Sequence, residues 1–202
     1  SGCGGLTGGR IGYGGTVKIL NCTNEMHIKT NYTDPSGGLC GELMGYEGTC
    51  IFDNCENKGN ITTTNSGGMC SVYAGKGGIG TFTNCSNTGI ISGEKAGGLC
   101  GQGAFNIELS NCSNTGVITG KSAGGMCGEN AQNVIMEYCF NTGKLSGDFA
   151  GGLGGTAIGK SGAEALIMYC YNTGEVASSQ GGGIIGSHAA DNAGLVTIIN
   201  CY

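Results

Sequence analysis

The sequence predicts an all-β protein, a parallel β-helix with three short strands per coil and about 27–33 residues in each coil. Three observations lead to this fold class. A repeat recurs along the chain, three apolar columns keep their place within the repeat, and 45 glycines argue against helices, because a glycine costs ~1 kcal/mol inside a helix. We expect a right-handed winding, since crossovers between parallel strands of one sheet are almost always right-handed.

Two anchors define the repeat. The first is the cysteine of an Asn-Cys or Tyr-Cys pair, which recurs at intervals of 33, 30, 27, 27, 31 and 31 residues. The second is the apolar residue after a Gly-Gly pair, with intervals of 33, 30, 30, 27, 27 and 31 residues. We expect the length differences to lie in loops on one side of the stack. A single solenoid domain over residues 1–202 follows, with a partial first coil over 1–16 and about six further coils.

Three apolar columns form the predicted core and mark the three strands of each coil. Three residues before the anchor cysteine stand Ile19, Phe52, Phe82, Leu109, Met136, Ile167 and Ile198. Six residues after it stand Ile28, Ile61, Ile91, Ile118, Leu145 and Val176. After the Gly-Gly pairs stand Leu6, Leu39, Met69, Leu99, Met126, Leu153 and Ile184. One coil cannot outweigh the backbone entropy of its own ordering, so stability must come from stacking.

A column of asparagines lies two residues after the anchor cysteine: Asn24, Asn57, Asn87, Asn114, Asn141 and Asn172. We expect a structural ladder at a corner of the coil, in which each amide hydrogen-bonds to the amides above and below it. The alternative is that these amides bind a ligand.

Eleven of the 13 cysteines also lie in columns. Seven are the anchors Cys22, Cys55, Cys85, Cys112, Cys139, Cys170 and Cys201, and four follow a Gly-Gly-Leu or Gly-Gly-Met triplet, namely Cys40, Cys70, Cys100 and Cys127. The sequence leaves two states open. The columns can be free thiols that fill the core, or stacked pairs can form disulfides in an oxidising compartment, because coils lie ~4.8 Å apart. A zinc site is not expected without a C-x-x-C pair or nearby histidines.

Five sequons are candidate N-glycosylation sites of a secreted protein: Asn21, Asn31, Asn60, Asn84 and Asn111. If the anchor cysteine faces the core, strand alternation directs the preceding asparagine outward. Asn21, Asn84 and Asn111 would then share one outer face.

The Gly-Gly-Leu-Cys-Gly, Gly-Gly-Met-Cys-Gly and Gly-Gly-Ile-Ile-Gly elements, with Asn-Cys-X-Asn-Thr-Gly between them, resemble GLUG-motif repeats. Such repeats occur in bacterial surface adhesins and in some secreted peptidases, and the resemblance covers nearly the whole chain. It implies a surface-exposed or secreted repeat region that is commonly non-enzymatic.

The expected function is therefore that of a non-enzymatic structural or adhesive surface protein outside the cell, without a cofactor. Carboxylates are scattered, and the histidines, His27 and His188, do not neighbour a nucleophile. A net charge of −5 argues against nucleic acid as a partner, and no apolar run is long enough for a membrane span. The alternatives are a carbohydrate-binding or carbohydrate-active β-helix and an ice-binding solenoid, for which the column Thr88, Thr115, Thr142 and Thr173 would be the surface.

The expected partners are other copies of the chain and host-surface glycans or proteins. The sequence opens and closes part-way through a repeat, and its last strand would carry Val196 and Ile198 on one face. An uncovered coil end presents unpaired backbone groups over apolar side chains. We expect an axial contact there, either with further chain or, head to tail, with another copy in a filament.

Overall fold

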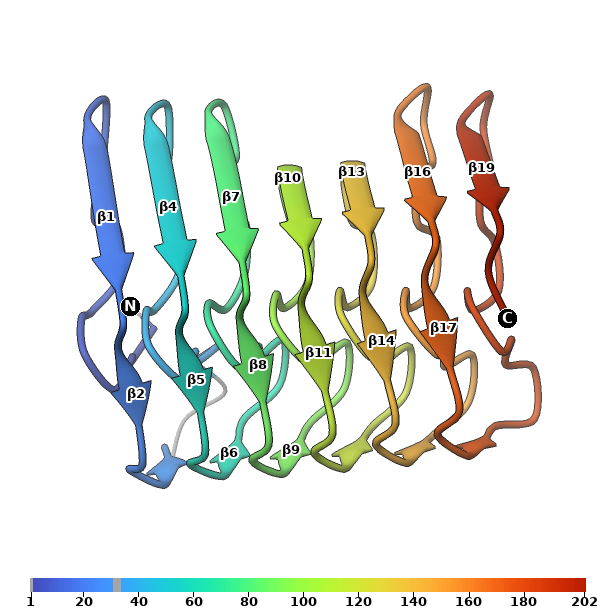
Figure 1. Ribbon diagram of the computed structural model, residues 1–202, viewed down its shortest axis with the longest axis horizontal. Helices are drawn as coiled ribbons and strands as arrows, with labels where there is room; N and C mark the ends of the chain where they lie inside the picture. The colour runs from blue at the N-terminus through green and yellow to red at the C-terminus, as the bar shows by residue number, and fades with distance from the viewer. Residues whose placement is uncertain (1, 31–33) are drawn as a thin grey trace.

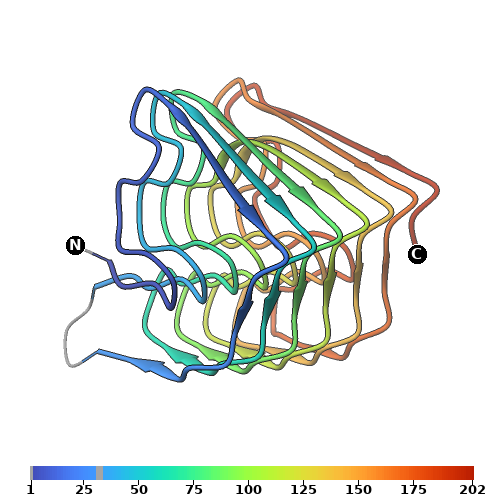
Figure 2. The same cartoon turned by 60° about the vertical axis from the view of Figure 1, so that its left-hand side comes forward.

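The computed structural model is a right-handed parallel β-helix and describes residues 2–30 and 34–202. In Figure 1 the strands on the near side run downward, the chain returns behind them, and each coil lies to the right of the one before it. Seen from the N-terminal end, as in Figure 2, the chain winds clockwise as it moves away from the viewer, which is the right-handed sense. The described residues contain strands and turns and no helix, so none of them forms a helix that could cross a membrane. The predicted fold class is confirmed.

The strands form three parallel sheets. The first sheet contains β1 (Thr16–Leu20), β4 (Thr49–Asp53), β7 (Ile79–Thr83), β10 (Phe105–Ser110), β13 (Gln132–Glu137), β16 (Glu164–Met168) and β19 (Leu195–Ile199). The second contains β2 (Thr23–Asn24), β5 (Glu56–Asn57), β8 (Ser86–Asn87), β11 (Ser113–Asn114), β14 (Phe140–Asn141) and β17 (Tyr171–Asn172). The third contains β3 (Ile28–Lys29), β6 (Ile61–Thr62), β9 (Ile91–Ser92), β12 (Ile118–Thr119), β15 (Leu145–Ser146) and β18 (Val176–Ala177).

The strand register stacks equivalent residues of successive coils over one another. The column before the anchor cysteine runs through the whole first sheet, and the column after it runs through the third. Within the first of these columns, the rings of Phe52 and Phe82 stack with their centroids 4.7 Å apart. Interior members of the columns are buried, whereas Leu6 and Ile198 are 46% and 48% exposed, because a neighbouring coil covers them on one side only.

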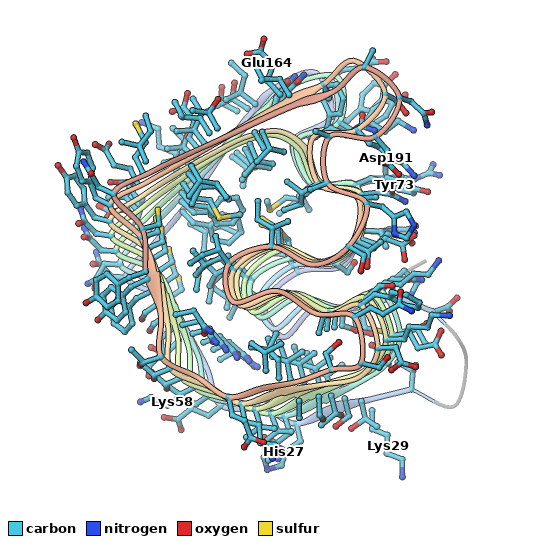
Figure 3. The ribbon with its side chains drawn as sticks, turned by 90° about the vertical axis from the view of Figure 1, so that its right-hand side faces the viewer. His27, Lys29, Lys58, Tyr73, Glu164 and Asp191 are labelled. Carbon is cyan, nitrogen blue, oxygen red and sulfur yellow. The ribbon has the colours of Figure 1, made fainter. Side chains whose placement is uncertain are left out.

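The Gly-Gly-Leu segments differ from the prediction. We expected them to form one strand of each coil, but the remaining strand is the two-residue strand that carries the column of asparagines. The Gly-Gly segments instead turn into the interior, as Figure 3 shows, and pair with neighbouring coils at isolated positions such as Gly97–Gly124 and Cys100–Cys127. They separate a large core beneath the first sheet from a smaller core around the third-sheet column.

The second glycine of each pair except the last, Gly183, is required by its surroundings. A Cβ atom on Gly125 would lie 2.0 Å from the carbonyl oxygen of Gly152 and 2.8 Å from the Cβ of Asn141. The inward segments therefore pack on one another and on the asparagine column without space for a methyl group. This close approach explains why the pair recurs, a reason beyond the poor helix propensity of glycine.

Candidate functional site

The asparagine column forms a continuous hydrogen-bonded ladder. Each side-chain amide donates to the Oδ1 atom of the next asparagine, over distances of 2.8, 2.7, 2.7, 2.6 and 2.7 Å from Asn24 to Asn172. Its second N–H donates to the carbonyl oxygen two residues further on, at 2.9 Å in the pair Asn114–Gly116. Interior members such as Asn114 are fully buried and face the inward segments, rather than lying at an outer corner. Because both N–H groups are used, the ladder has a structural role and presents no free donor to a ligand.

The cysteine columns line the large core. Anchor thiols donate to carbonyl oxygens of the preceding coil, as Cys55 does to Ile19 at 3.2 Å and Cys112 to Phe82 at 3.3 Å. In the other column, the sulfurs of Cys70 and Cys100 lie 3.6 Å apart. The sulfurs are unbonded in this structure. Burial also raises the pKa of Cys40 and of Cys50, a cysteine outside both columns, to about 12.

A thiol titration tests these positions. The thiolate is the reactive form, so buried thiols with raised pKa values should be protected. At pH 8 we expect exposed Cys3 to react rapidly with Ellman's reagent, while Cys40, Cys70, Cys100 and Cys127 react only after unfolding. In denaturant without a reductant, 13 reactive thiols would establish the free state, whereas a lower number would establish disulfides. Rapid reaction of the columnar thiols in the native protein would contradict the core placement.

Three of the sequons lie on the outer surface. Asn21, Asn84 and Asn111 are exposed at the corner before the anchor cysteine, with φ values of 53°, 54° and 52°. Asparagine tolerates this left-handed conformation better than most residues, which explains its recurrence there. Asn60 is half-buried, and its Oδ1 atom accepts a hydrogen bond from the backbone N–H of Ile90. The fifth sequon, Asn31, lies outside the described residues.

Each histidine has a structural contact of its own, and the threonine column lies on the surface. Nδ1 of His27 accepts a hydrogen bond from the backbone N–H of Asn60 at 3.0 Å, and His188 packs edge-on against Phe149. Within residues 2–30 and 34–202, no group of three or more histidine, cysteine or acidic side chains is placed to hold a metal ion. The threonine column is exposed but only one residue wide, and an ion pair between Lys144 and Glu175 lies beside it.

Two aromatic stacks, each at least partly exposed, occupy the C-terminal coils and were not predicted. Tyr138 stacks on Tyr169 with ring centroids 5.3 Å apart. Phe140, Tyr171 and Tyr202 form a second stack with spacings of 5.1 and 5.2 Å. The available signal was the aromatic residues that precede or follow the last three anchor cysteines, because identical registers place such rings directly over one another.

The most pronounced hollow lies where two coils are short. The connections 101–104 and 128–131 lead into β10 and β13, whereas the loops 71–78 and 155–163 lead into β7 and β16. Figure 1 shows that the tops of β10 and β13 are lower than their neighbours on both sides. We call this depression the saddle. Among these four coils the length differences lie in loops on one side of the stack, as predicted, and they shape the surface.

One rim of the saddle is held by a second, short asparagine ladder. Asn106 donates to the carbonyl oxygen of Gly78 at 2.9 Å, and Asn133 donates to Oδ1 of Asn106 at 3.0 Å. Oδ1 of Asn133 then accepts the backbone N–H of Glu164 at 3.2 Å. Asn106 and Asn133 have positive φ values of 51° and 50°. They bridge the two taller coils across the shortened ones and fix the shape of the saddle.

The function of this protein must be inferred from its sequence, fold and surface geometry. No family model matches the chain, and no match was found among curated proteins or solved structures.

Proposed function

We propose that this protein is a non-enzymatic structural and adhesive solenoid on an extracellular surface, the role that the resemblance to GLUG-motif repeats implies. The observation that carries the proposal is the chemistry of two adjoining surface hollows, which are lined by tyrosine, amide and lysine side chains. Such linings bind polymers through stacking and hydrogen bonds. The exposed corner with Asn21, Asn84 and Asn111 supports an extracellular location, where glycans could be attached.

Axial assembly is the structural half of this proposal. At the last coil, Ile198 is 48% exposed, whereas Ile167, its equivalent one coil earlier, is fully buried. Water contact on this apolar side chain of the core column and an unpaired strand edge favour coverage by another strand. We propose that further chain or a second copy provides it, the latter in a head-to-tail contact that would build a filament.

The assembly proposal is tested on native material by electron microscopy and sedimentation. Rods longer than one solenoid, or a longer chain that continues the coils, are the expected results. In a concentration series of the 202-residue chain, Ile198→Lys should weaken self-association if copies meet end to end. Ile135→Lys is the matched control, because Ile135 is exposed on the outer face of β13. A stable native monomer that ends at Tyr202 with its last coil open to water would overturn the proposal.

Of the two alternative functions, the structure favours carbohydrate binding over ice binding. Ice binding requires a flat, regular array, and the threonine column is flanked by the Lys144–Glu175 ion pair and by the Phe140–Tyr171 stack. Absence of thermal hysteresis is the expected result. Carbohydrate binding has a specific supporting feature in the saddle.

A further inference from the structure

The saddle is a cavity with two matched walls. Lys76 follows Cys70 by six residues, and Lys160 follows Gly154 by six residues, so the two lysines occupy equivalent places in the long loops after the inward Gly-Gly segments. The two short coils between them have no equivalent residue, because their loops are too short. Three steps between coils separate the lysines, so the wall backbones stand ~14 Å apart. The enclosed volume is about 530 Å³, within the usual range for ligand sites.

The floor and one wall present aromatic and amide groups. Tyr73 is 41% exposed, and its ring lies over Gly103, where a Cβ atom would meet the ring carbons at 2.8 Å. Phe105, Asn130 and Gln132 complete the floor, all of them partly exposed. The amide nitrogen of Asn130 donates to Oε1 of Glu129 at 3.1 Å. The floor therefore combines flat apolar surface with amide groups.

Each wall carries a lysine, and carboxylates lie near both walls. Nζ of Lys76 lies 4.7 Å above the centre of the Tyr73 ring. Neither Lys76 nor Lys160 belongs to an ion pair within the described part of the chain. Of the nearby carboxylates, Glu129 contacts Lys95 at 3.6 Å, and Glu47 accepts a hydrogen bond from Tyr13 and thereby raises the pKa of that phenol.

A second hollow extends the saddle along the solenoid toward the N-terminal coils. It has a volume of about 370 Å³ and shares Tyr46, Tyr73 and Lys76 with the saddle. Tyr46 stacks on Tyr13 with ring centroids 5.6 Å apart, and Arg10 adds a further cation. The two hollows together form a groove parallel to the axis of the coils, with aromatic surface and cations along its length. Such a groove fits an extended polymer better than a compact small molecule.

We propose that this groove, centred on the saddle, binds a segment of an acidic polysaccharide. Tyr73 and Phe105 would pack against the apolar faces of sugar rings, and the amides of Asn130 and Gln132 would bond to hydroxyl groups. Lys76 and Lys160 would each approach a carboxylate or sulfate group of the chain. The inference rests on the proposed adhesive function and names the class of ligand and the site. A single nucleic acid strand would also use rings and cations, but the amides of the floor suit the many hydroxyl groups of a saccharide.

Calorimetric titration with four defined polymers tests the proposal. The probes are an oligo-alginate, which carries carboxylates, a heparin oligosaccharide, which carries sulfates, an uncharged dextran oligomer and oligo-dT. We expect one or both acidic saccharides to bind more tightly than dextran and oligo-dT, with an affinity that falls as salt is added. The comparison of alginate with heparin then identifies the anionic group. Tighter binding of oligo-dT than of every saccharide would overturn the proposal in favour of nucleic acid.

Variants locate the binding site. Lys76→Gln with Lys160→Gln, and separately Tyr73→Ala, should each lower the affinity for the acidic saccharide about tenfold or more. The control is Lys29→Gln, because Lys29 lies on another side of the coil, as Figure 3 shows. Thermal melts of all variants identify any loss of folding. Acidic saccharide binding that is unchanged in the saddle variants would reject the saddle while leaving an adhesive function elsewhere. Binding to none of the saccharides would reject the acidic-polysaccharide proposal, and the assembly experiment would still test the structural function separately.

Discussion

Replacing Leu109 with aspartate is expected to abolish cooperative folding of the central coils. Leu109 is 1% exposed in β10, between Phe82 and Met136 in the neighbouring strands of the first sheet. An aspartate there would bury a carboxyl group without a partner, and the loss of packing would add to this cost. Leu109→Ala alone should cost ~2–5 kcal/mol. Since whole domains are stable by only ~5–15 kcal/mol, the aspartate variant should lose its unfolding transition.

Circular dichroism melts of four variants measure this effect. Glu108→Ala is the matched control, because Glu108 lies next to Leu109 in β10 but is exposed on the outer face. We expect the control to melt within a few degrees of the parent protein and Leu109→Ala to melt at a clearly lower temperature. If Leu109→Asp melted at the parent temperature, this column would not belong to the core. Phe82→Asp should behave as Leu109→Asp does, since Phe82 occupies the same column in β7.

The core columns were predictable because the repeat itself identifies them. Once the anchor cysteines are aligned, every position can be compared over six or seven coils, and apolar columns such as Ile61–Ile91–Ile118 become evident. The ladder was predictable for the same reason, since a buried amide that recurs in register can bond to its copies. Its inward direction was not predicted, because a two-residue strand is too short for an alternation pattern to indicate which side faces the core.

The path of the Gly-Gly segments could not be inferred from the sequence. A leucine between glycine and cysteine, as in Leu99, satisfies the pattern of a short buried strand equally well. Only the structure shows that the segment turns into the interior and that Gly98 packs against Asn114. The two residues are 16 positions apart and lie in neighbouring coils, so no local sequence pattern predicts the contact.

The saddle was partly visible in the sequence. The two anchors place the shortening between the Gly-Gly triplet and the next anchor cysteine, an interval of 16 residues from Met69 to Cys85 but 13 from Leu99 to Cys112. They do not indicate what fills the space above the shortened coils. Asn106 and Asn133 stand where the longer loops of the other coils would be, and both have a left-handed backbone. Their side chains bond to each other and to the backbone of Gly78 and Glu164 in the neighbouring coils. The site thus results from a deletion that the neighbouring coils do not share, and a search for recurring residues does not find it.

Asn114→Asp is expected to make the stability of the solenoid depend on pH. Oδ1 of Asn114 accepts a hydrogen bond from Asn87 at 2.7 Å, which a carboxylate could also accept. The Nδ2 atom donates to Oδ1 of Asn141 at 2.6 Å and to the carbonyl oxygen of Gly116 at 2.9 Å. A carboxylate oxygen at that position would face two acceptors inside the protein. A protonated carboxyl group could still donate to one of them, so the folded state favours the protonated form and raises the pKa of the new carboxyl.

The sign of the pH effect follows from this raised pKa. Below the pKa of the unfolded chain, near 3.9, the carboxyl group is protonated in both states and the variant loses only one hydrogen bond. As the pH rises toward the folded-state pKa, the unfolded chain releases its proton first, and the free energy of unfolding falls. At pH 8 the loss should reach ~3–5 kcal/mol, the cost of an uncompensated buried charge. Urea titrations of the variant and the parent protein at pH 4 and pH 8 measure this difference. Asn111→Asp, on the exposed corner three residues earlier, should show almost no variant-specific change, and an equally small change for Asn114→Asp would mean that the ladder does not hold the coils together.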